Sequence, residues 1–219
     1  MLTALLLSLA LGGCQTAAQK LEDDRARAIA FLTEITFGDN SDVVDQKTLP
    51  GRRIARWAKA PTISIEGKPS DIQREAVAES ARKLSGATRF DIRVVDRDGD
   101  IRIDFSDKQD FVTRRTSIVG CYSFPIHRSG RIRSAEIKIG RRYGPDSVIC
   151  LDHELMHAFG FFGHSTRLRS VMSSVHTDQR FTEWDLLALR IIYNPGIYNN
   201  ATWEDIELLA RILIDEALQ

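Results

Sequence analysis

The sequence predicts an α+β fold in which a helix packs on a mixed, twisted sheet, with a motif-bearing helix beside it. Two observations lead to this prediction. One strand-like segment is followed by a helical segment and then by four more strand-like segments. The C-terminal part alternates loops and helical segments, which predicts a helical subdomain there. With 219 residues, 43% of them hydrophobic, the chain is long enough to bury a sizeable core.

Local patterns place the individual elements. Alternating apolar and polar side chains between turn-forming residues predict strands. The predicted strands are residues 62–66, 91–95, 101–105, 121–126 and 132–139. Helical spacing of apolar residues and capping side chains predict helices. The predicted helices are residues 18–37, 70–84, 145–159, 182–192 and 202–218, with a connecting arm at residues 45–60.

Start and stop signals support these helices. Ser70 is a good N-cap for the second helix, and Gly86 is its expected stop signal. Pro145 is expected to open the helix that follows the strands. Thr202 and Asp205 have the spacing of a capping box, so they predict the start of the last helix.

Turn signals pair the strands. Residues 97–100 (Arg-Asp-Gly-Asp) predict a hairpin between strands 91–95 and 101–105. Ser129 and Gly130 predict a second pair across the following turn.

The N-terminus has the pattern of an export signal. Residues 2–11 are mostly apolar, too few to span a bilayer but enough for the core of a signal peptide. Residues 11–14 (Leu-Gly-Gly-Cys) resemble the lipobox of bacterial lipoproteins. That resemblance implies a cleaved signal peptide at residues 1–13 and a lipidated Cys14, and Gln15 implies sorting to the outer membrane. We therefore expect a lipid-anchored protein that faces the periplasm; the alternative is a secretory peptide with an incidental cysteine.

The other two cysteines are Cys121 and Cys150. Because an exported compartment is oxidising, they are a candidate disulfide. The alternatives are two buried free thiols, or Cys150 as a metal ligand one helical turn before His153. The formal net charge is zero, which argues against a nucleic-acid partner, and we expect a monomer.

The strongest functional signal is the stretch of residues 153–164, His-Glu-Leu-Met-His-Ala-Phe-Gly-Phe-Phe-Gly-His. On a helix, His153 and His157 project from nearly the same face and can meet one metal ion. Glu154 can reach a water on that metal without binding it and can take its proton. All five histidines of the chain fall between His127 and His176, as expected for a site.

With His164 and Met172, this stretch resembles the metzincin zinc endopeptidases, whose signature is His-Glu-x-x-His-x-x-Gly-x-x-His followed by a Met-turn. The resemblance implies a metzincin-like domain with His153, His157 and His164 as Zn²⁺ ligands. It also implies Glu154 as general base, Met172 as the Met-turn and residues 122–125 as the substrate-holding edge strand. Three residues instead of two separate Gly160 from His164, and we expect a loop bulge with a positive φ at Gly163 to absorb the difference.

Two other residues compete for the third position. Glu183 is the choice if a downstream helix supplies the ligand, and His176 is the other option. The chain also looks similar to a family of bacterial lipoproteins of unknown function, in many of whose members the zinc motif is degraded.

The sequence thus predicts a signal peptide at residues 1–13, an N-terminal helix and arm at residues 14–50, and a metzincin-like domain at residues 51–219. The predicted function is zinc-dependent hydrolysis of a protein or peptide substrate, by an enzyme that contacts the membrane through its N-terminal lipid. The alternative is a non-catalytic envelope lipoprotein in which the fold serves binding and zinc is structural or absent. A fourth protein ligand would favour the alternative, because a catalytic zinc needs an open position.

Overall fold

The computed structural model describes residues 16–38, 52–112, 118–175 and 178–219. The predicted signal peptide at residues 1–13, Cys14 and His176 lie outside these ranges. Among the described helices, none is both long and apolar enough to cross a membrane.

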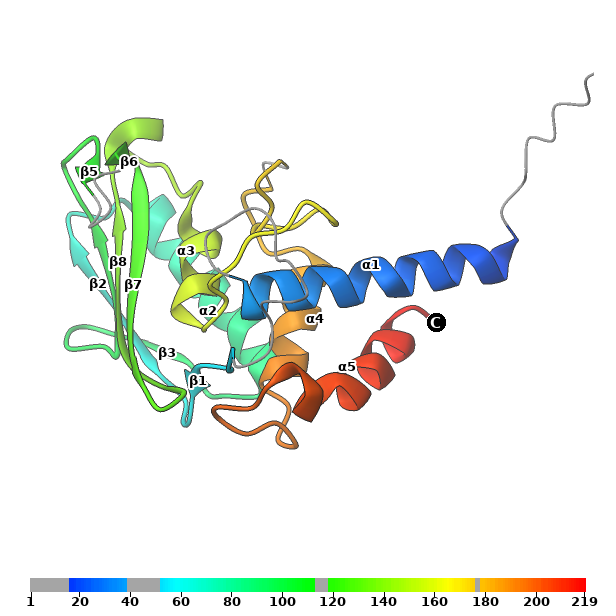
Figure 1. Cartoon of the computed structure of the whole chain (residues 1–219). Coiled ribbons are helices and arrows are strands. Elements are labelled where there is room, and N and C mark those ends of the chain that lie inside the picture. The colour runs from blue at the N-terminus through cyan, green and yellow to red at the C-terminus, as the bar shows by residue number, and fades with distance from the viewer. Residues whose placement is uncertain (1–15, 39–51, 113–117, 176–177) are drawn as a thin grey trace, which may run out of the picture.

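The described residues form an α+β fold with five α-helices and a mostly parallel sheet (Figure 1). The helices are α1 (Ala17–Phe37), α2 (Asp71–Thr88), α3 (Leu151–Ala158), α4 (Glu183–Ile192) and α5 (Trp203–Ala217), with a short 3₁₀ helix, η2, at Arg141–Tyr143. The strands are β1 (Arg56–Trp57), β2 (Thr62–Gly67), β3 (Arg93–Val95), β4 (Ile101–Phe105), β5 (Phe111–Val112), β6 (Ile118–Val119), β7 (Cys121–Arg128) and β8 (Arg131–Ile139).

The main sheet has the order β1-β8-β4-β2-β3, and β7 pairs with β8. Strands β1, β8, β4, β2 and β3 are all parallel, whereas β7 runs antiparallel to β8. The expectation of a mixed sheet is therefore confirmed. Within the described residues β7 pairs with β8 alone, so β7 is an edge strand. Strands β5 and β6 form a separate two-stranded sheet.

The predicted hairpin around residues 97–100 is wrong. Strands β3 and β4 do not pair with each other; each lies parallel to β2, on opposite sides of it. The connecting loop crosses β2 so closely that a Cβ at Gly99 would lie 2.4 Å from the backbone nitrogen of Ser64. Gly99 is therefore required by a close backbone approach rather than by a hairpin turn. The second predicted pair is confirmed as β7 and β8, joined by Ser129 and Gly130, both at positive φ.

Two helix boundaries also differ from the prediction. Helix α2 continues through Gly86 to Thr88 and ends at Arg89 in the left-handed conformation. No atom lies within 4 Å of a Cβ built at Gly86, so this glycine meets no steric need and does not end the helix. Helix α3 starts at Leu151 rather than at residue 145, because the preceding residues form separate tight turns. Strands β1, β5 and β6 were not predicted, since two residues are too few to show alternation.

Helix α1 belongs to the same core as the sheet. Its buried apolar side chains join one hydrophobic cluster with residues of β2, β4, β8, α3 and α4. Those side chains are Ala28, Phe31, Leu32, Ile35 and Phe37, each at most 2% exposed. Along its length α1 contacts α5 and α4, and its C-terminal end lies next to the segment that follows α3 (Figure 1). Burial of these side chains fixes the position of α1 relative to α3.

A disulfide joins Cys121, at the start of β7, to Cys150, the N-cap residue of α3. Their Cα atoms lie 6.3 Å apart. The bond ties the edge strand to the first residue of the helix that carries the His-Glu-x-x-His motif. It spans 29 residues of sequence, so it restricts the unfolded chain substantially.

Removal of this disulfide is expected to destabilise the protein. For a closed loop of this length, the chain-entropy model gives a loss of about 3.5 kcal/mol in the free energy of unfolding. Urea denaturation of the oxidised wild type and of the double variant Cys121→Ala, Cys150→Ala measures the difference. Reduced wild type is the control and should match the double variant. Equal unfolding midpoints for oxidised wild type and the double variant would contradict the prediction.

Candidate metal centre

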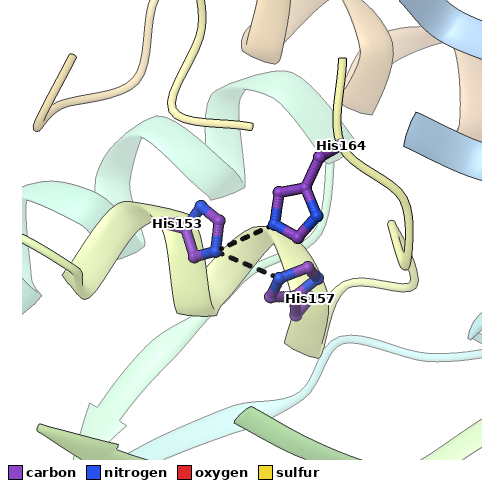
Figure 2. A group of neighbouring side chains, drawn as sticks. All are labelled: His153, His157 and His164. Atoms are coloured by element: carbon purple, nitrogen blue, oxygen red, sulfur yellow. Dashed lines mark hydrogen bonds between the residues drawn. The ribbon is translucent and has the colours of Figure 1, made fainter. Parts of the chain in front are cut away.

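Helix α3 brings His153 and His157 together. Residues four apart lie on one face of a helix, and the two ring centroids are 4.7 Å apart. Both rings direct their Nε2 atoms toward each other, at a separation of 3.1 Å (Figure 2). The helix packs against β7 and β8, which keeps this face at a fixed place beside the sheet.

Two backbone carbonyls determine the protonation of these rings. Nδ1 of His153 lies 2.7 Å from the carbonyl oxygen of Val171, and Nδ1 of His157 lies 2.6 Å from that of Phe161. A carbonyl only accepts, so each Nδ1 must carry the hydrogen and donate it. In the neutral rings, both Nε2 atoms are then unprotonated, and two lone pairs face each other across 3.1 Å. Such a contact is not a hydrogen bond; it is the arrangement that metal-ligating histidines show.

His164 completes the cluster from the opposite side. It comes from the loop after α3, and its Nε2 lies 3.4 Å from Nε2 of His153 (Figure 2). The ligand atoms of His153, His157 and His164 all lie within 4.8 Å of one another. Two nitrogens about 2.05 Å from one tetrahedral ion would be about 3.3 Å apart, close to the two printed separations. These three histidines can therefore hold a metal ion.

The extra residue before His164 is accommodated by two close backbone contacts. Gly160 has a φ of 98°, and a Cβ there would lie 1.9 Å from the carbonyl oxygen of Ala55. The positive φ expected at Gly163 is wrong; that residue is instead pressed against α1, where a Cβ would lie 2.0 Å from the carbonyl oxygen of Glu34. Phe161, within the lengthened loop, supplies the carbonyl that orients His157.

Met172 lies in the turn that faces the cluster, and its side chain is fully buried. Its carbonyl accepts the backbone N–H of Ser165, next to His164, at 3.0 Å. Its own N–H donates to Oγ of Ser170 at 2.8 Å. The turn of residues 170–172 thus contacts the histidine cluster at two points. The Val171 carbonyl accepts Nδ1–H of His153, and the Met172 carbonyl accepts the N–H of Ser165, next to His164.

Asp185, a buried residue of α4, holds that turn in place. It accepts the Ser170 hydroxyl on one carboxylate oxygen and the Val171 N–H, at 3.2 Å, on the other. It also forms the capping box at the start of α4 with Thr182. Burial raises the pKa of Asp185, and its hydrogen bonds to Ser170 and Thr182 oppose that rise. The Asp185 carboxyl therefore joins the N-terminus of α4 to the turn whose Val171 carbonyl orients His153.

A second buried carboxyl anchors the motif helix itself. Asp152 accepts the Ser80 hydroxyl of α2, Nε of Arg180 at 3.1 Å and the N–H of Phe181 at 2.8 Å. Burial raises its pKa, while Ser80 and Arg180 oppose the rise. Three separate elements therefore meet at the residue before His153.

Glu154 is 5% exposed, and among the described residues its carboxyl has no hydrogen-bond partner. Burial raises its pKa to about 8. Burial also lowers the pKa of His153, and lowers that of His157 well below its ordinary value, helped by the two neighbouring histidines. Burial thus favours the neutral, metal-binding form of His153 and His157 and the protonated form of the Glu154 carboxyl.

The other predicted ligands lie elsewhere. The Glu183 side chain is 88% exposed and pairs with Arg190 on the surface of α4. The sulfur of Cys150 is in the disulfide, so it is not a thiolate ligand. His127, which was not a predicted ligand, is exposed, and its ring lies tilted against that of Phe162. Within the described part of the chain, the cluster contains His153, His157 and His164 and no fourth His, Cys, Asp or Glu ligand.

Sequence reasoning did not identify the supporting residues. Asp185 lies three positions after Thr182, a capping-box spacing that could have drawn attention to it. Glu34 interrupts the apolar C-terminal end of α1. The carbonyls of Val171 and Phe161 have no sequence signal, because every residue has the same backbone carbonyl whatever its side chain.

Residues 25–209 match the model of a family described as "Protein of unknown function (DUF2927)". The match covers most of the chain, so the chain belongs to this family. A comparison with curated proteins found no match.

The Asp185 support can be tested by metal affinity. Asp185→Ala removes the bonds to Ser170 and Val171, so the carbonyl that orients His153 is no longer held. Loss of such an outer-shell partner typically weakens metal binding about 10- to 100-fold. Titration of the metal-free protein with Co²⁺, against a competing chelator, measures this change.

Asp205→Ala is the matched control. Asp205 forms the same type of capping box with Thr202 at the start of α5 and is not among the residues that group with His153, His157 and His164 in the described part of the chain. It should bind Co²⁺ like the wild type. If both variants bind Co²⁺ equally well, Asp185 has no role in the metal centre.

Proposed function

We propose that this member of the DUF2927 family is a zinc-dependent endopeptidase with a metzincin-like fold. One observation carries the proposal: the ligand atoms of His153, His157 and His164 all lie within 4.8 Å of one another, and the buried carboxyl of Glu154, the residue after His153, has no hydrogen-bond partner among the described residues. Structural metal sites use four protein ligands, whereas catalytic zinc sites use three and keep a position open. The three-histidine set fits the catalytic type.

The donor chemistry supports zinc among the available metals. Imidazole nitrogens suit zinc and other late transition metals, whereas magnesium and calcium prefer oxygen ligands. A zinc ion held by His153, His157 and His164 would supply Lewis acidity toward the substrate carbonyl and make water a better nucleophile. The carbonyls of Val171 and Phe161 would hold two of the ligand rings in place.

In this proposal Glu154 moves the proton. Its carboxylate accepts a proton from the attacking water and later delivers it to the nitrogen of the leaving amine. Burial alone favours the protonated form, with a pKa of about 8. A dication nearby would favour the carboxylate and bring this pKa down toward the working range of a general base.

The edge strand β7 supports a peptide as substrate. It lies beside α3, and within the described residues its outer edge has no strand partner. An extended peptide can add to such an edge through backbone hydrogen bonds. The predicted substrate-holding residues 122–125 lie within this strand. A peptide bound there would run past the N-terminal part of α3, to which Cys150 ties β7.

We further propose that Cys14 is lipidated and anchors the enzyme to the bacterial outer membrane, facing the periplasm. The Cys121–Cys150 disulfide supports an oxidising compartment. Helix α1 begins at Ala17, directly after the proposed anchor. The anchor would therefore connect to the folded domain through a helix that is part of its core.

Lipidation is tested by expressing the full precursor in a bacterial host with radioactive palmitate. The wild type should incorporate label and fractionate with membranes. Cys14→Ser should lose both the label and the membrane fraction. Label that persists in Cys14→Ser would contradict the assignment of Cys14.

Catalysis is tested by separating metal binding from cleavage. Glu154→Ala should bind zinc with near wild-type stoichiometry, because Glu154 is not a ligand. Removal of a general base typically costs 10²- to 10⁴-fold in rate, so cleavage of a peptide library should fall by about that factor. Zinc content by mass spectrometry and library cleavage by peptide sequencing are the two readouts.

Outcomes of this experiment separate the enzyme from a non-catalytic binding protein. If wild type and Glu154→Ala cleave equally, the cleavage does not come from this site. If wild type binds zinc but cleaves nothing in a library that covers all residue pairs around the bond, the endopeptidase proposal is overturned.

A further inference from the structure

The N-terminal helix contacts the loop that carries His164. Most residues at the C-terminal end of α1 are buried, including the polar residues Thr33, Glu34 and Thr36. Gly163, directly before His164, donates its backbone N–H to the carbonyl of Ile35 at 3.0 Å. The two backbones are so close that no side chain fits at Gly163, as its contact with Glu34 shows.

The Glu34 side chain binds the residues that follow His164. Its Oε2 accepts the hydroxyl of Ser165 at 2.6 Å, and its Oε1 accepts Nε of Arg167 at 2.9 Å. Ser165 is fully buried, and its Oγ also accepts the N–H of Arg167. A single carboxylate therefore fixes two residues of the loop within three positions of His164.

The residues on both sides of His164 in sequence are consequently held in place. Gly163 is bonded to α1, while Ser165 is bonded to Glu34 through its hydroxyl and to the Met172 carbonyl through its N–H. The loop thus lies between α1 on one side and the turn of residues 170–172 on the other. Both supports must be in place for His164 to keep its position relative to His153.

Stability alone is a weak reason for a carboxylate at this position. Glu34 is 8% exposed, and its cationic partner Arg167 is about half exposed. Removing a charge from water costs free energy that such a pair recovers only in part, and an apolar residue in a well-packed helix is often more stabilising. A buried carboxylate with two directed hydrogen bonds does fix the geometry of the groups it binds.

We propose that Glu34 is a positioning residue for the third metal ligand, so that α1 is a working part of the metal centre. This inference rests on the metal centre of the proposed function. It means that one of the three ligands is held by a helix that precedes the motif by more than one hundred residues in sequence. Any displacement of the C-terminal end of α1, where Glu34 and Ile35 contact the loop, would move the His164 loop with it.

The test uses the mature chain that begins at residue 14, in metal-free form, titrated with Co²⁺ and with Zn²⁺ in competition with a chelator. Glu34→Ala removes both bonds from the loop, and Glu34→Gln keeps an acceptor for Ser165. We expect Glu34→Ala to lose about 10- to 100-fold in affinity, the usual effect of an outer-shell partner. Glu34→Gln should recover part of that loss.

A spectroscopic readout separates positioning from a general loss of stability. The visible absorption of bound Co²⁺ depends on the number and geometry of its ligands. The spectrum of Glu34→Ala should move toward that of His164→Ala, in which the ligand is absent. Thr36→Val is the matched control on the same buried end of α1, since the Thr36 hydroxyl has no hydrogen-bond partner among the described residues. Asp215→Asn is the control for loosening α1, because it weakens the ion pair between Arg25 and α5.

Both controls should keep wild-type affinity and spectrum. If Glu34→Ala unfolds at the assay temperature, Ser165→Ala carries the same test: it removes the hydroxyl that donates to Glu34 and accepts the N–H of Arg167, and it leaves α1 unchanged. Wild-type affinity and spectrum in Glu34→Ala or Ser165→Ala, with binding lost in His164→Ala, overturn the inference and leave the metal centre standing. If the wild type binds neither ion, the metal centre of the proposed function fails, and this inference fails with it.

Discussion

The candidate metal centre depends on one electrostatic constraint: two imidazole lone pairs face each other across 3.1 Å in a partly buried space. The constraint arises because the carbonyls of Val171 and Phe161 take the only hydrogen of each neutral ring. Protonation could relieve it, but burial lowers the pKa of both histidines. A metal ion bound to His153, His157 and His164 would relieve it while His153 and His157 stay neutral.

The remainder of the fold serves to hold this arrangement. Each ligand has its own support from a different part of the chain. Asp185 in α4 fixes the turn that orients His153, the loop carbonyl of Phe161 orients His157, and Glu34 in α1 fixes the loop of His164. The disulfide at Cys150 and the buried carboxyl of Asp152 fix the start of α3. Because these supports come from α1, the start of α3, the loop after α3 and α4, the site forms only when the whole domain is folded.

The sequence predicts what depends on local spacing and misses what depends on distant contacts. His153 and His157 follow from helix geometry, and the helix caps at Ser70 and Thr202 follow from side-chain chemistry. The hairpin at residues 97–100 was wrong because an Asp-Gly pair has the same composition whether it turns a hairpin or crosses a strand at close range. Glu34 could not be assigned from the sequence, because its partner Ser165 is 131 positions away.

The most direct test of the central claim is X-ray absorption spectroscopy at the zinc edge, on zinc-loaded wild type and on His164→Ala. The proposed zinc site predicts three imidazole nitrogens and one further light atom at about 2.0–2.1 Å in the wild type, with no sulfur at about 2.3 Å. One imidazole should be lost in His164→Ala. A sulfur ligand, a fourth protein ligand, or identical spectra for the two proteins would contradict the assignment of His153, His157 and His164 as an open three-histidine zinc site.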